Sequence, residues 1–357
     1  MTLPELIGRC LIVGLPGHNL TDELISHLRN LHVGGFIAFT RNFASPDQFR
    51  ALVEAVRQAV GRPVLVFVDH EGGRIIRFHQ GVTRFPSALE MGRRSLGDID
   101  RQGQTEGEEL RRLGVDVNLA PCVDVLVEGS NPVIGDRSYG REPHRVAACA
   151  VARIEGLRRA GVAACAKHFP GLGMVPKDPH RHLPTVSLDE ATLRDTHWIP
   201  FAASVAVGVP AVMSSHVCYP QLEGVPGLPA TFSATLIQQV LRKQLGFGGA
   251  VLTDDLEMGA LRELLDRPPH GSRSSLAEGV VGRRAIARRH FLAEGVVAIG
   301  EAAVRALEAG HDGLLVCSNL QMQWAVAQAV LEACEQGRIG RAQLERSVDR
   351  LERLRLK

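Results

Sequence analysis

The chain has 357 residues, of which 45% are hydrophobic and 22% are charged, and its formal net charge is +2. This balance is typical of a globular protein with a large core, and it gives no sign of a nucleic acid or membrane recognised through bulk charge. Aromatic residues make up 4% of the chain, which argues against a platform that stacks the bases of single-stranded nucleic acid.

Cysteine usage and the N-terminal sequence indicate a reducing compartment. The seven cysteines are scattered and include no CxxC pair, a pattern that predicts free thiols. The first residues lack the basic region of a secretory signal peptide, and no apolar run reaches the roughly 18 residues of a membrane span. We therefore expect a cytoplasmic protein.

In chain order, eight short apolar and β-branched runs predict β-strands. They lie at residues 9–15, 34–40, 63–69, 115–121, 162–168, 210–216, 249–255 and 312–318. The runs are almost continuously apolar, as in parallel strands that are covered on both faces. Helix-length amphipathic segments separate them, for example 21–31 and 45–60, the second of which begins with a Ser-Pro helix start.

Eight strand–helix units without a break in composition predict a single domain over 1–357 with an α/β, TIM-like (β/α)8 barrel fold. A doubly wound open sheet is the alternative, but no GxGxxG motif follows the first predicted strand. One segment interrupts the pattern: residues 262–290 contain seven arginines and the first copy of LAEGVV, which occurs again at 292–297. We interpret 262–290 as an arginine-rich surface insertion.

Ionisable residues stand at the ends of four predicted strands. They are Asp69, Lys167, His168, His216, Asp254 and Asp255. The active site of a (β/α)8 barrel lies at the carboxyl ends of its strands, so these side chains are expected on one face. Each has a structural interpretation when taken alone, for example a helix cap for Asp255, but their convergence favours a catalytic site.

The segment KHFPGLGMVPKDPHRHLP, residues 167–184, follows the fifth strand and is too rich in glycine and proline to be a helix. Asp178 stands two residues before His180, where a carboxylate can orient an imidazole that acts as an acid and base. With Asp254 as a carboxylate nucleophile, this dyad is typical of a retaining glycosidase in which histidine replaces the usual second carboxylate. A zinc site of Asp178, His180, His182 and His168 is the alternative, although Arg181 would place positive charge beside the metal.

Taken together, the motifs are similar to those of the bacterial β-N-acetylglucosaminidases of glycoside hydrolase family 3, in their single-domain form. The resemblance covers nearly the whole chain and is carried by VDHEGGRIIRF, FPSALEMG, LAPCVDV, NPVIGDRSYG, KHFPG, the Asp-x-His loop, SSHVCYP, LGFGGAVLTDDLEMGA and AVRALEAGHDGLLVC. It implies a TIM-like barrel that hydrolyses O-glycosyl bonds without a cofactor or metal. The implied reaction removes terminal N-acetylglucosamine from muropeptide-derived sugars of the N-acetylglucosaminyl-anhydromuramyl type, during cell-wall (peptidoglycan) recycling. We expect the enzyme to be a monomer.

The resemblance also implies the role of each site residue. Asp254 becomes the nucleophile, His180 the acid and base, and Asp178 the residue that orients His180. The residues that hold the sugar are Asp69, Arg77, Arg137, Lys167 and His168. The chain departs from the usual KHFPGHGD at Leu172 and Met174, which replace a histidine and an aspartate that help to organise the loop. Between Asp178 and His180, Pro179 replaces a small residue.

Two other functions stay open at this point. A phosphorylase on the same scaffold would transfer the sugar to phosphate, which a neutral histidine repels less than a glutamate would. A non-catalytic sugar-binding relative would keep the pocket and lose turnover.

Overall fold

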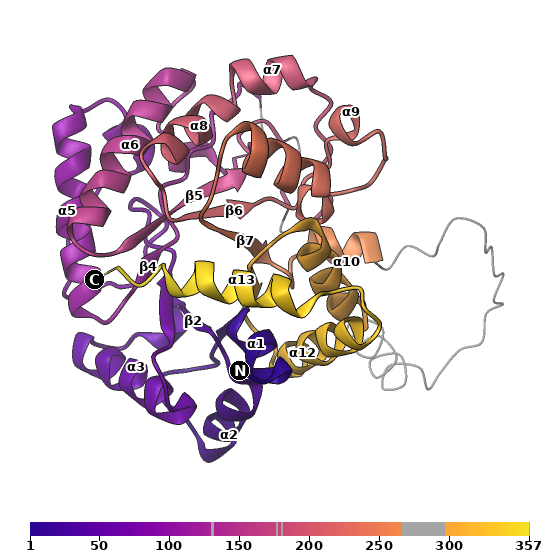
Figure 1. Ribbon diagram of the computed structural model, residues 1–357. Coiled ribbons are helices and arrows are strands. Elements are labelled where there is room, and N and C mark those ends of the chain that lie inside the picture. The colour runs from indigo at the N-terminus through magenta and orange to yellow at the C-terminus, as the bar shows by residue number, and fades with distance from the viewer. Residues whose placement is uncertain (130–131, 176–177, 180, 266–296, 357) are drawn as a thin grey trace, which may run out of the picture.

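The structure is a computed structural model of the chain and describes residues 1–129, 132–175, 178–179, 181–265 and 297–356. Eight parallel strands form a closed barrel in chain order (Figure 1). They are β1 (Leu11–Gly14), β2 (Gly35–Ala38), β3 (Leu65–Val68), β4 (Val117–Asn118), β5 (Ala163–Phe169), β6 (Ala211–Ser214), β7 (Ala250–Asp255) and β8 (Gly313–Val316). Leu11 opposite Leu314 and Val13 opposite Val316 close the barrel between β1 and β8. The predicted (β/α)8 fold is confirmed, and each predicted strand range overlaps one observed strand.

Helices surround the barrel and connect its strands (Figure 1). They are α1 (Leu3–Arg9), α2 (Asp22–Leu31), α3 (Pro46–Val60), α4 (Ala88–Met91), α5 (Leu96–Arg112), α6 (Pro143–Arg159), α7 (Glu190–Asp195), α8 (Trp198–Ala206), α9 (Pro220–Glu223), a π-helix at Thr235–Gln244, α10 (Gly259–Leu265), helical residues 297–309, α12 (Leu320–Glu335) and α13 (Arg341–Glu352). Short 3₁₀ turns lie at Thr40–Asn42, Gly135–Arg137 and Ala230–Phe232.

The predicted helices at 21–31 and 45–60 form because their ends satisfy the free backbone groups. The hydroxyl of Thr21 accepts a hydrogen bond from the N–H of Leu24, and the hydroxyl of Ser45 accepts one from Gln48. Such N-caps stabilise a helix by about 1 kcal/mol. Gly61 ends α3 with φ of 73°, a left-handed conformation that glycine adopts without strain.

Burial on both faces explains why the strands are so apolar. Side chains of one parity point into the barrel, and those of the other parity pack beneath the helices. In β3, for example, Leu65 and Phe67 belong to the interior cluster, whereas Val66 and Val68 belong to the cluster under the helices. A polar side chain on either face of a strand would therefore be buried. For this reason the polar side chains are found where the strands end.

The barrel interior is closed at the amino ends of the strands. Leu351 of α13 and Leu354 just after it belong to the same buried cluster as the interior side chains of the strands. Helix α13, shown in yellow, lies across the barrel in Figure 1. The interior can therefore open only at the carboxyl ends of the strands, which is where the sequence places its ionisable residues.

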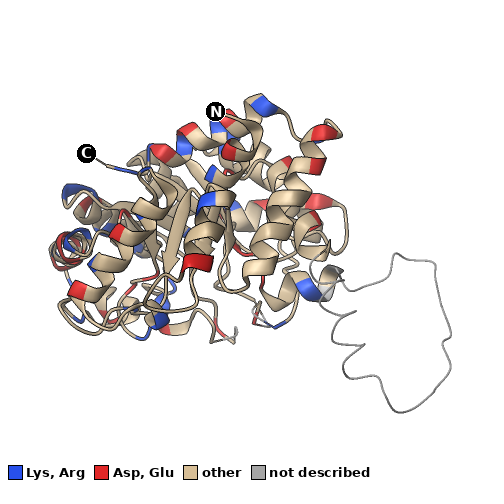
Figure 2. Cartoon of the chain, turned by 90° about the horizontal axis from the view of Figure 1, so that it is seen from below, with Lys and Arg blue, Asp and Glu red and all other residues tan. Residues whose placement is uncertain are grey.

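Residues of both charges, Lys and Arg in blue and Asp and Glu in red, are spread over the helices in Figure 2. The predicted insertion at 262–290 lies outside the described residues from position 266 onward. Within the described ranges, every helix is too short or too polar to cross a lipid bilayer.

Candidate active site

A cavity of about 770 Å³ opens at the carboxyl ends of the strands. Seven of the predicted site residues line it: Asp69, Arg77, Arg137, Lys167, His168, Asp178 and Asp254. The remaining one, His180, lies outside the described residues. The described part of the chain therefore brings together in one place every residue that it contains of those to which the resemblance assigned a role.

Irregular pairing in two strands turns neighbouring side chains into the same cavity. In a regular strand, consecutive residues point to opposite faces. The register shifts between Lys167 and Phe169 in β5 and between Leu252 and Asp255 in β7. Such irregularities re-aim side chains near active sites. This explains why Lys167 and His168 both line the cavity, and why Asp254 and Asp255 do so too.

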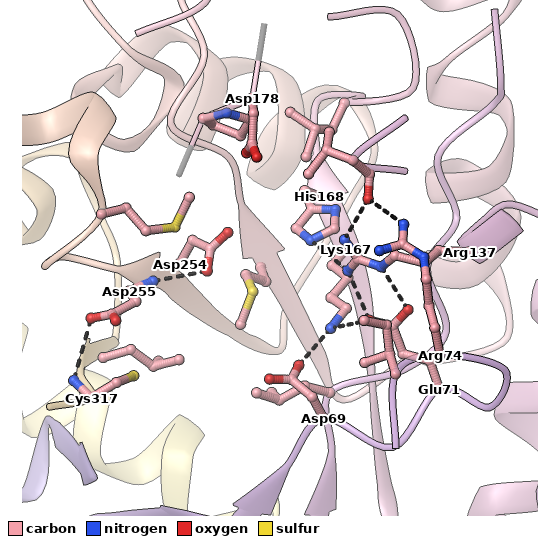
Figure 3. Close-up of a pocket in the computed structure, with 18 of the residues that line it drawn as sticks. Asp69, Glu71, Arg74, Arg137, Lys167, His168, Asp178, Asp254, Asp255 and Cys317 are labelled. Atoms are coloured by element: carbon pink, nitrogen blue, oxygen red, sulfur yellow. Dashed lines mark hydrogen bonds and ion pairs between the residues drawn. The ribbon is translucent and has the colours of Figure 1, made fainter. Parts of the chain in front are cut away.

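One side of the cavity is a compact network of ion pairs (Figure 3). The Lys167 Nζ atom lies 2.7 Å from a carboxylate oxygen of Asp69 and 2.7 Å from one of Glu71. Arg137 donates two hydrogen bonds to the Glu71 carboxylate, at 2.8 and 2.9 Å. Arg77 contacts the other oxygen of Asp69 at 3.4 Å. These charges fix one another, so the network presents a preformed polar surface to a ligand.

The network keeps its members charged although they are buried. Burial alone would raise the pKa of Glu71, but Arg137 and Lys167 more than offset it and hold the pKa far below its usual value. Burial would lower the pKa of Lys167, and the carboxylates of Asp69 and Glu71 raise it instead. Lys167 therefore stays a cation, and it cannot serve as a base near neutral pH.

The loop after β3 folds back so that both its arginines reach the cavity. Gly72 and Gly73 have φ of 97° and 55°, and a Cβ on Gly73 would lie 2.8 Å from the Cα of Ser87, so the turn requires glycine. Arg74 pairs with Asp136 at 2.7 Å, and the N–H of Arg77 donates to Nδ1 of His70 at 3.3 Å. Burial, with the positive charges of Arg153 and Arg77, lowers the pKa of His70 to about 3, so its ring is neutral and can accept this bond.

The opposite side of the cavity carries carboxyl groups from the end of β7 (Figure 3). An oxygen of Asp254 accepts a hydrogen bond from the N–H of Asp255 at 2.8 Å. Asp255 turns toward the backbone and accepts hydrogen bonds from the N–H groups of Glu257 and Cys317, at 3.1 and 3.3 Å. Burial, with the nearby charges of Glu257 and Asp254, raises the pKa of Asp255 to about 7. Of these two residues, Asp254 is therefore the one whose carboxyl group is available to a ligand.

One expectation from the sequence needs revision. His216 is buried and does not line the cavity; its ring contacts the hydroxyl of Thr231 at 2.6 Å and the carbonyl oxygen of Asp255 at 3.0 Å. It therefore supports the end of β7. The zinc alternative stays untested, because His180, one of its four members, lies outside the described residues. Within the described ranges, the side chains close enough together to hold a metal ion are Cys122, Asp124 and His168.

Sequence reasoning missed Glu71, Arg74 and Asp124. Glu71 and Arg74 stand in the motif VDHEGGRIIRF, and their position between Asp69 and Arg77, which the sequence analysis named, was a usable signal. Asp124 follows the fourth strand, and its partner His168 lies 44 positions away, so no local pattern indicates their contact.

Comparison with known proteins agrees with this geometry. Residues 2–281 match the glycosyl hydrolase family 3 N-terminal domain. A β-hexosaminidase of Methylococcus capsulatus is 37% identical over 323 residues, covering 88% of this chain and 85% of that protein. One of Xylella fastidiosa (strain M23) is 40% identical over 259 residues, covering 71% of this chain and 76% of that protein.

Solved structures resemble the whole chain. A family 3 β-N-acetylglucosaminidase of Paenibacillus sp. superimposes with a TM-score of 0.85 at 36% identity, and the match covers 99% of this chain and 62% of that one. NagZ of Neisseria gonorrhoeae, solved in complex with a zinc ion, gives a TM-score of 0.78 at 27% identity over 97% of this chain and 90% of that one. With its barrel, its cavity and these relatives, the chain belongs to glycoside hydrolase family 3 and is a glycosidase.

Proposed function

We propose that the protein is a retaining exo-β-N-acetylglucosaminidase that removes terminal N-acetylglucosamine from muropeptide-derived sugars. The observation that carries this proposal is the division of one cavity: Asp254 at the end of β7 lies across from a network of paired charges that suits sugar hydroxyls (Figure 3). The relatives named as β-hexosaminidases support the choice of sugar.

The reaction has two balanced steps. In the first, a carboxylate oxygen of Asp254 attacks C1 of the sugar as the C1–O bond to the leaving group breaks, and His180 donates its proton to the departing oxygen. In the second, water attacks C1 of the glycosyl–Asp254 ester and gives a proton to His180, which releases the carboxylate and a sugar of the original configuration. Asp178, which lines the cavity, orients His180 in this proposal.

The other side of the cavity binds the sugar. Asp69, Arg77, Arg137, Lys167 and His168 form hydrogen bonds to its hydroxyl and acetamido groups, and Glu71 belongs to the same set because it pairs with two of them. Ionised donors and acceptors make shorter and stronger hydrogen bonds than neutral ones, and their mutual pairing limits reorganisation when the sugar arrives.

We place this activity in peptidoglycan recycling, in the cytoplasm, with the enzyme as a monomer. A reducing compartment is supported by the cysteines: none of the seven forms a disulfide, and six of them are buried.

Release of nitrophenol from its β-N-acetylglucosaminide and from its β-glucoside tests the substrate assignment. A site built to hydrogen-bond the acetamido group should prefer the first substrate by about 10²-fold or more in kcat/KM. Comparable values for the two substrates would contradict the assignment.

Proton NMR of the first-formed sugar tests retention, because a retaining enzyme releases the β-anomer first. Equal initial rates in phosphate and in an inert buffer would indicate hydrolysis, whereas a faster rate in phosphate would indicate phosphorolysis.

A further inference from the structure

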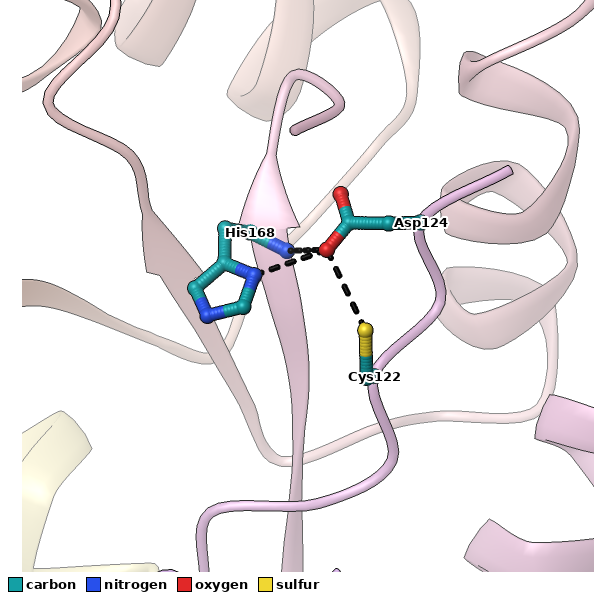
Figure 4. Close-up of side chains that lie close together, drawn as sticks. All are labelled: Cys122, Asp124 and His168. Carbon is teal, nitrogen blue, oxygen red and sulfur yellow. Dashed lines mark hydrogen bonds and ion pairs between the residues drawn. The ribbon is translucent and has the colours of Figure 1, made fainter. Parts of the chain in front are cut away.

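A buried carboxylate lies just behind the cavity wall, in the segment that follows β4. Asp124 is fully buried and is not among the residues that line the cavity. Its Oδ2 atom accepts hydrogen bonds from Nδ1 of His168 at 2.7 Å, from the backbone N–H of His168 at 3.3 Å and from the thiol of Cys122 at 3.2 Å (Figure 4). Its Oδ1 atom accepts a hydrogen bond from the N–H of Leu172 at 2.5 Å.

These contacts determine which nitrogen of His168 carries the proton. The Nε2 atom of His168 lies 3.3 Å from Nη2 of Arg137, and a guanidinium group can only donate. Nε2 must therefore accept, so the proton is on Nδ1 and is donated to Asp124. Asp124 thus fixes both the tautomer and the direction of a ring that lines the sugar-binding side of the cavity.

The second oxygen of Asp124 holds the start of the loop that follows β5. The N–H of Val127 donates to the carbonyl of Gly173 at 3.0 Å, so the segments 124–127 and 171–173 lie side by side. A Cβ on Gly173 would lie 2.0 Å from the carbonyl oxygen of Val125, which shows how closely the two backbones approach. Leu172 is itself buried. The loop is therefore anchored through its backbone at the position where Leu172 replaces the usual histidine.

Asp124 also reaches a third part of the site through its main chain. Its carbonyl oxygen accepts a hydrogen bond from the hydroxyl of Ser138 at 2.7 Å, and Ser138 directly follows Arg137. One buried residue therefore contacts the sugar-binding histidine, the root of the loop that leads to Asp178, and the neighbour of a sugar-binding arginine.

The same three side chains have the spacing of a metal site, since the ligand atoms of Cys122, Asp124 and His168 lie within 4.8 Å of one another. Their chemistry argues against that use. A metal would need the Cys122 thiolate, but burial beside Asp124 raises the pKa of this thiol well above its usual value. A metal would also need an unprotonated Nδ1 on His168, but this nitrogen carries a proton that it donates to Asp124. The cluster is satisfied by its own hydrogen bonds.

We propose that Asp124 is a positioning residue that couples the two halves of the site: it holds His168 as the Nδ1–H tautomer for sugar binding and anchors Gly171–Leu172 so that the following loop starts in one place. The tautomer follows from the contacts alone, whereas the kinetic consequences rest on the proposed function.

Asp124→Asn tests the proposal at nearly constant volume. Its single oxygen can serve Leu172 or His168, and its amide group must face the other donor. If the oxygen stays with Leu172, His168 has to move its proton to Nε2, toward Arg137. We expect kcat/KM to fall by about 10²-fold, with a higher KM and a larger loss of kcat for a disaccharide than for a nitrophenyl glycoside. Cys122→Ala is the matched control, because it removes only the weak thiol donor from the same oxygen, and its kinetics should stay within about twofold of the wild type.

Nitrogen NMR of protein labelled with ¹⁵N-histidine gives a readout that does not depend on turnover. The chain has 14 histidines, and the signal that is missing in His168→Gln is that of His168. The expected result is an Nδ1–H tautomer in the wild type and in Cys122→Ala, and its loss in Asp124→Asn. An Nε2–H tautomer in the folded wild type would overturn the proposal, even if Asp124→Asn does not fold.

Tighter zinc binding by the wild type than by Cys122→Ala in calorimetry would also overturn the proposal, because the cluster would then be a metal site. Failure of the proposed function would appear differently, as a wild type that does not cleave the N-acetylglucosaminide while the tautomer is as expected.

Discussion

The β5 side and the β7 side of the cavity carry their charges in different ways. On the β5 side, Lys167 and Arg137 are paired with carboxylates at 2.7–2.9 Å, and their side chains are 2% and 10% exposed. On the β7 side, Asp254 and Asp255 have no cationic partner within 4.0 Å in the described ranges. Paired charges hold a fixed surface for a neutral sugar, whereas an unpaired carboxylate keeps its charge available for the positive charge that develops at C1. The two sides should therefore respond differently to mutation.

The largest effect is expected on the β7 side. Asp254→Asn removes the nucleophile while keeping its shape and its contact with the N–H of Asp255, so kcat should fall by about 10⁴-fold or more. The affinity for N-acetylglucosamine and the unfolding midpoint should change little, which calorimetry and denaturant titration would check. In the wild type, a 2-fluoro sugar with a good leaving group should label Asp254. A label located on Asp255 by mass spectrometry would reverse the assignment.

On the β5 side, stability and binding should both suffer. Lys167→Met leaves Asp69 and Glu71 without their shared cation in a buried setting, which typically costs about 3–5 kcal/mol of the free energy of unfolding. KM should rise as well. Urea denaturation measures the first effect, and Lys243→Met is the control, because Lys243 is exposed and donates only to Gln239 in the described ranges. An unfolding free energy of Lys167→Met equal to that of Lys243→Met would contradict the pairing.

A third prediction concerns the group that protonates the leaving oxygen. His180→Ala should reduce the rate for a disaccharide far more than for a nitrophenyl glycoside, because a phenolate of low pKa leaves without a proton. The ratio of the two losses should reach about 10²-fold, the lower range for general acid catalysis. His182→Ala, an exposed neighbour in the same loop, is the control. Equal losses on the two substrates would point to a structural role for His180.

The sequence was sufficient for the fold because strands buried on both faces must be apolar along their whole length. It also located residues at strand ends that line the cavity, since strand-end positions follow from the barrel itself. It failed where a role depends on a distant partner: Asp124 acquires its role from His168 and Leu172, which are 44 and 48 positions away. His216 has a strand-end position too, yet its ring turns to Thr231, a direction that position alone does not determine.

The same limit applies to the loop that follows β5, where Leu172 and Met174 replace the usual histidine and aspartate. These replacements would make the loop less ordered only if the side chains at these two positions held it in place. The contacts of Asp124 and Val127 with Leu172 and Gly173 are made to backbone atoms, so the side chain at position 172 does not take part in them. A side-chain comparison of sequences cannot reveal such an anchor.

The smallest effect separates Asp255 from Asp254. The raised pKa of Asp255, about 7 against 3.8, means that the folded protein holds this proton more tightly than the unfolded chain. The stability it contributes is therefore fully present below about pH 4 and is lost as pH rises toward 7, with a slope of at most about 1.4 kcal/mol per pH unit. Asp255→Asn keeps an oxygen that can accept from Glu257 and Cys317, and it cannot ionise.

Urea denaturation of both proteins between pH 4 and 8 isolates this contribution as the difference between their free energies of unfolding. The wild type should lose stability relative to Asp255→Asn as pH rises from about 4 to 7, and the difference should level off above that. Parallel curves would mean that Asp255 is ionised in the folded protein. It would then be a second anion beside Asp254, and the contrast within the β7 side, between one reacting carboxylate and one that holds the backbone, would have to be given up.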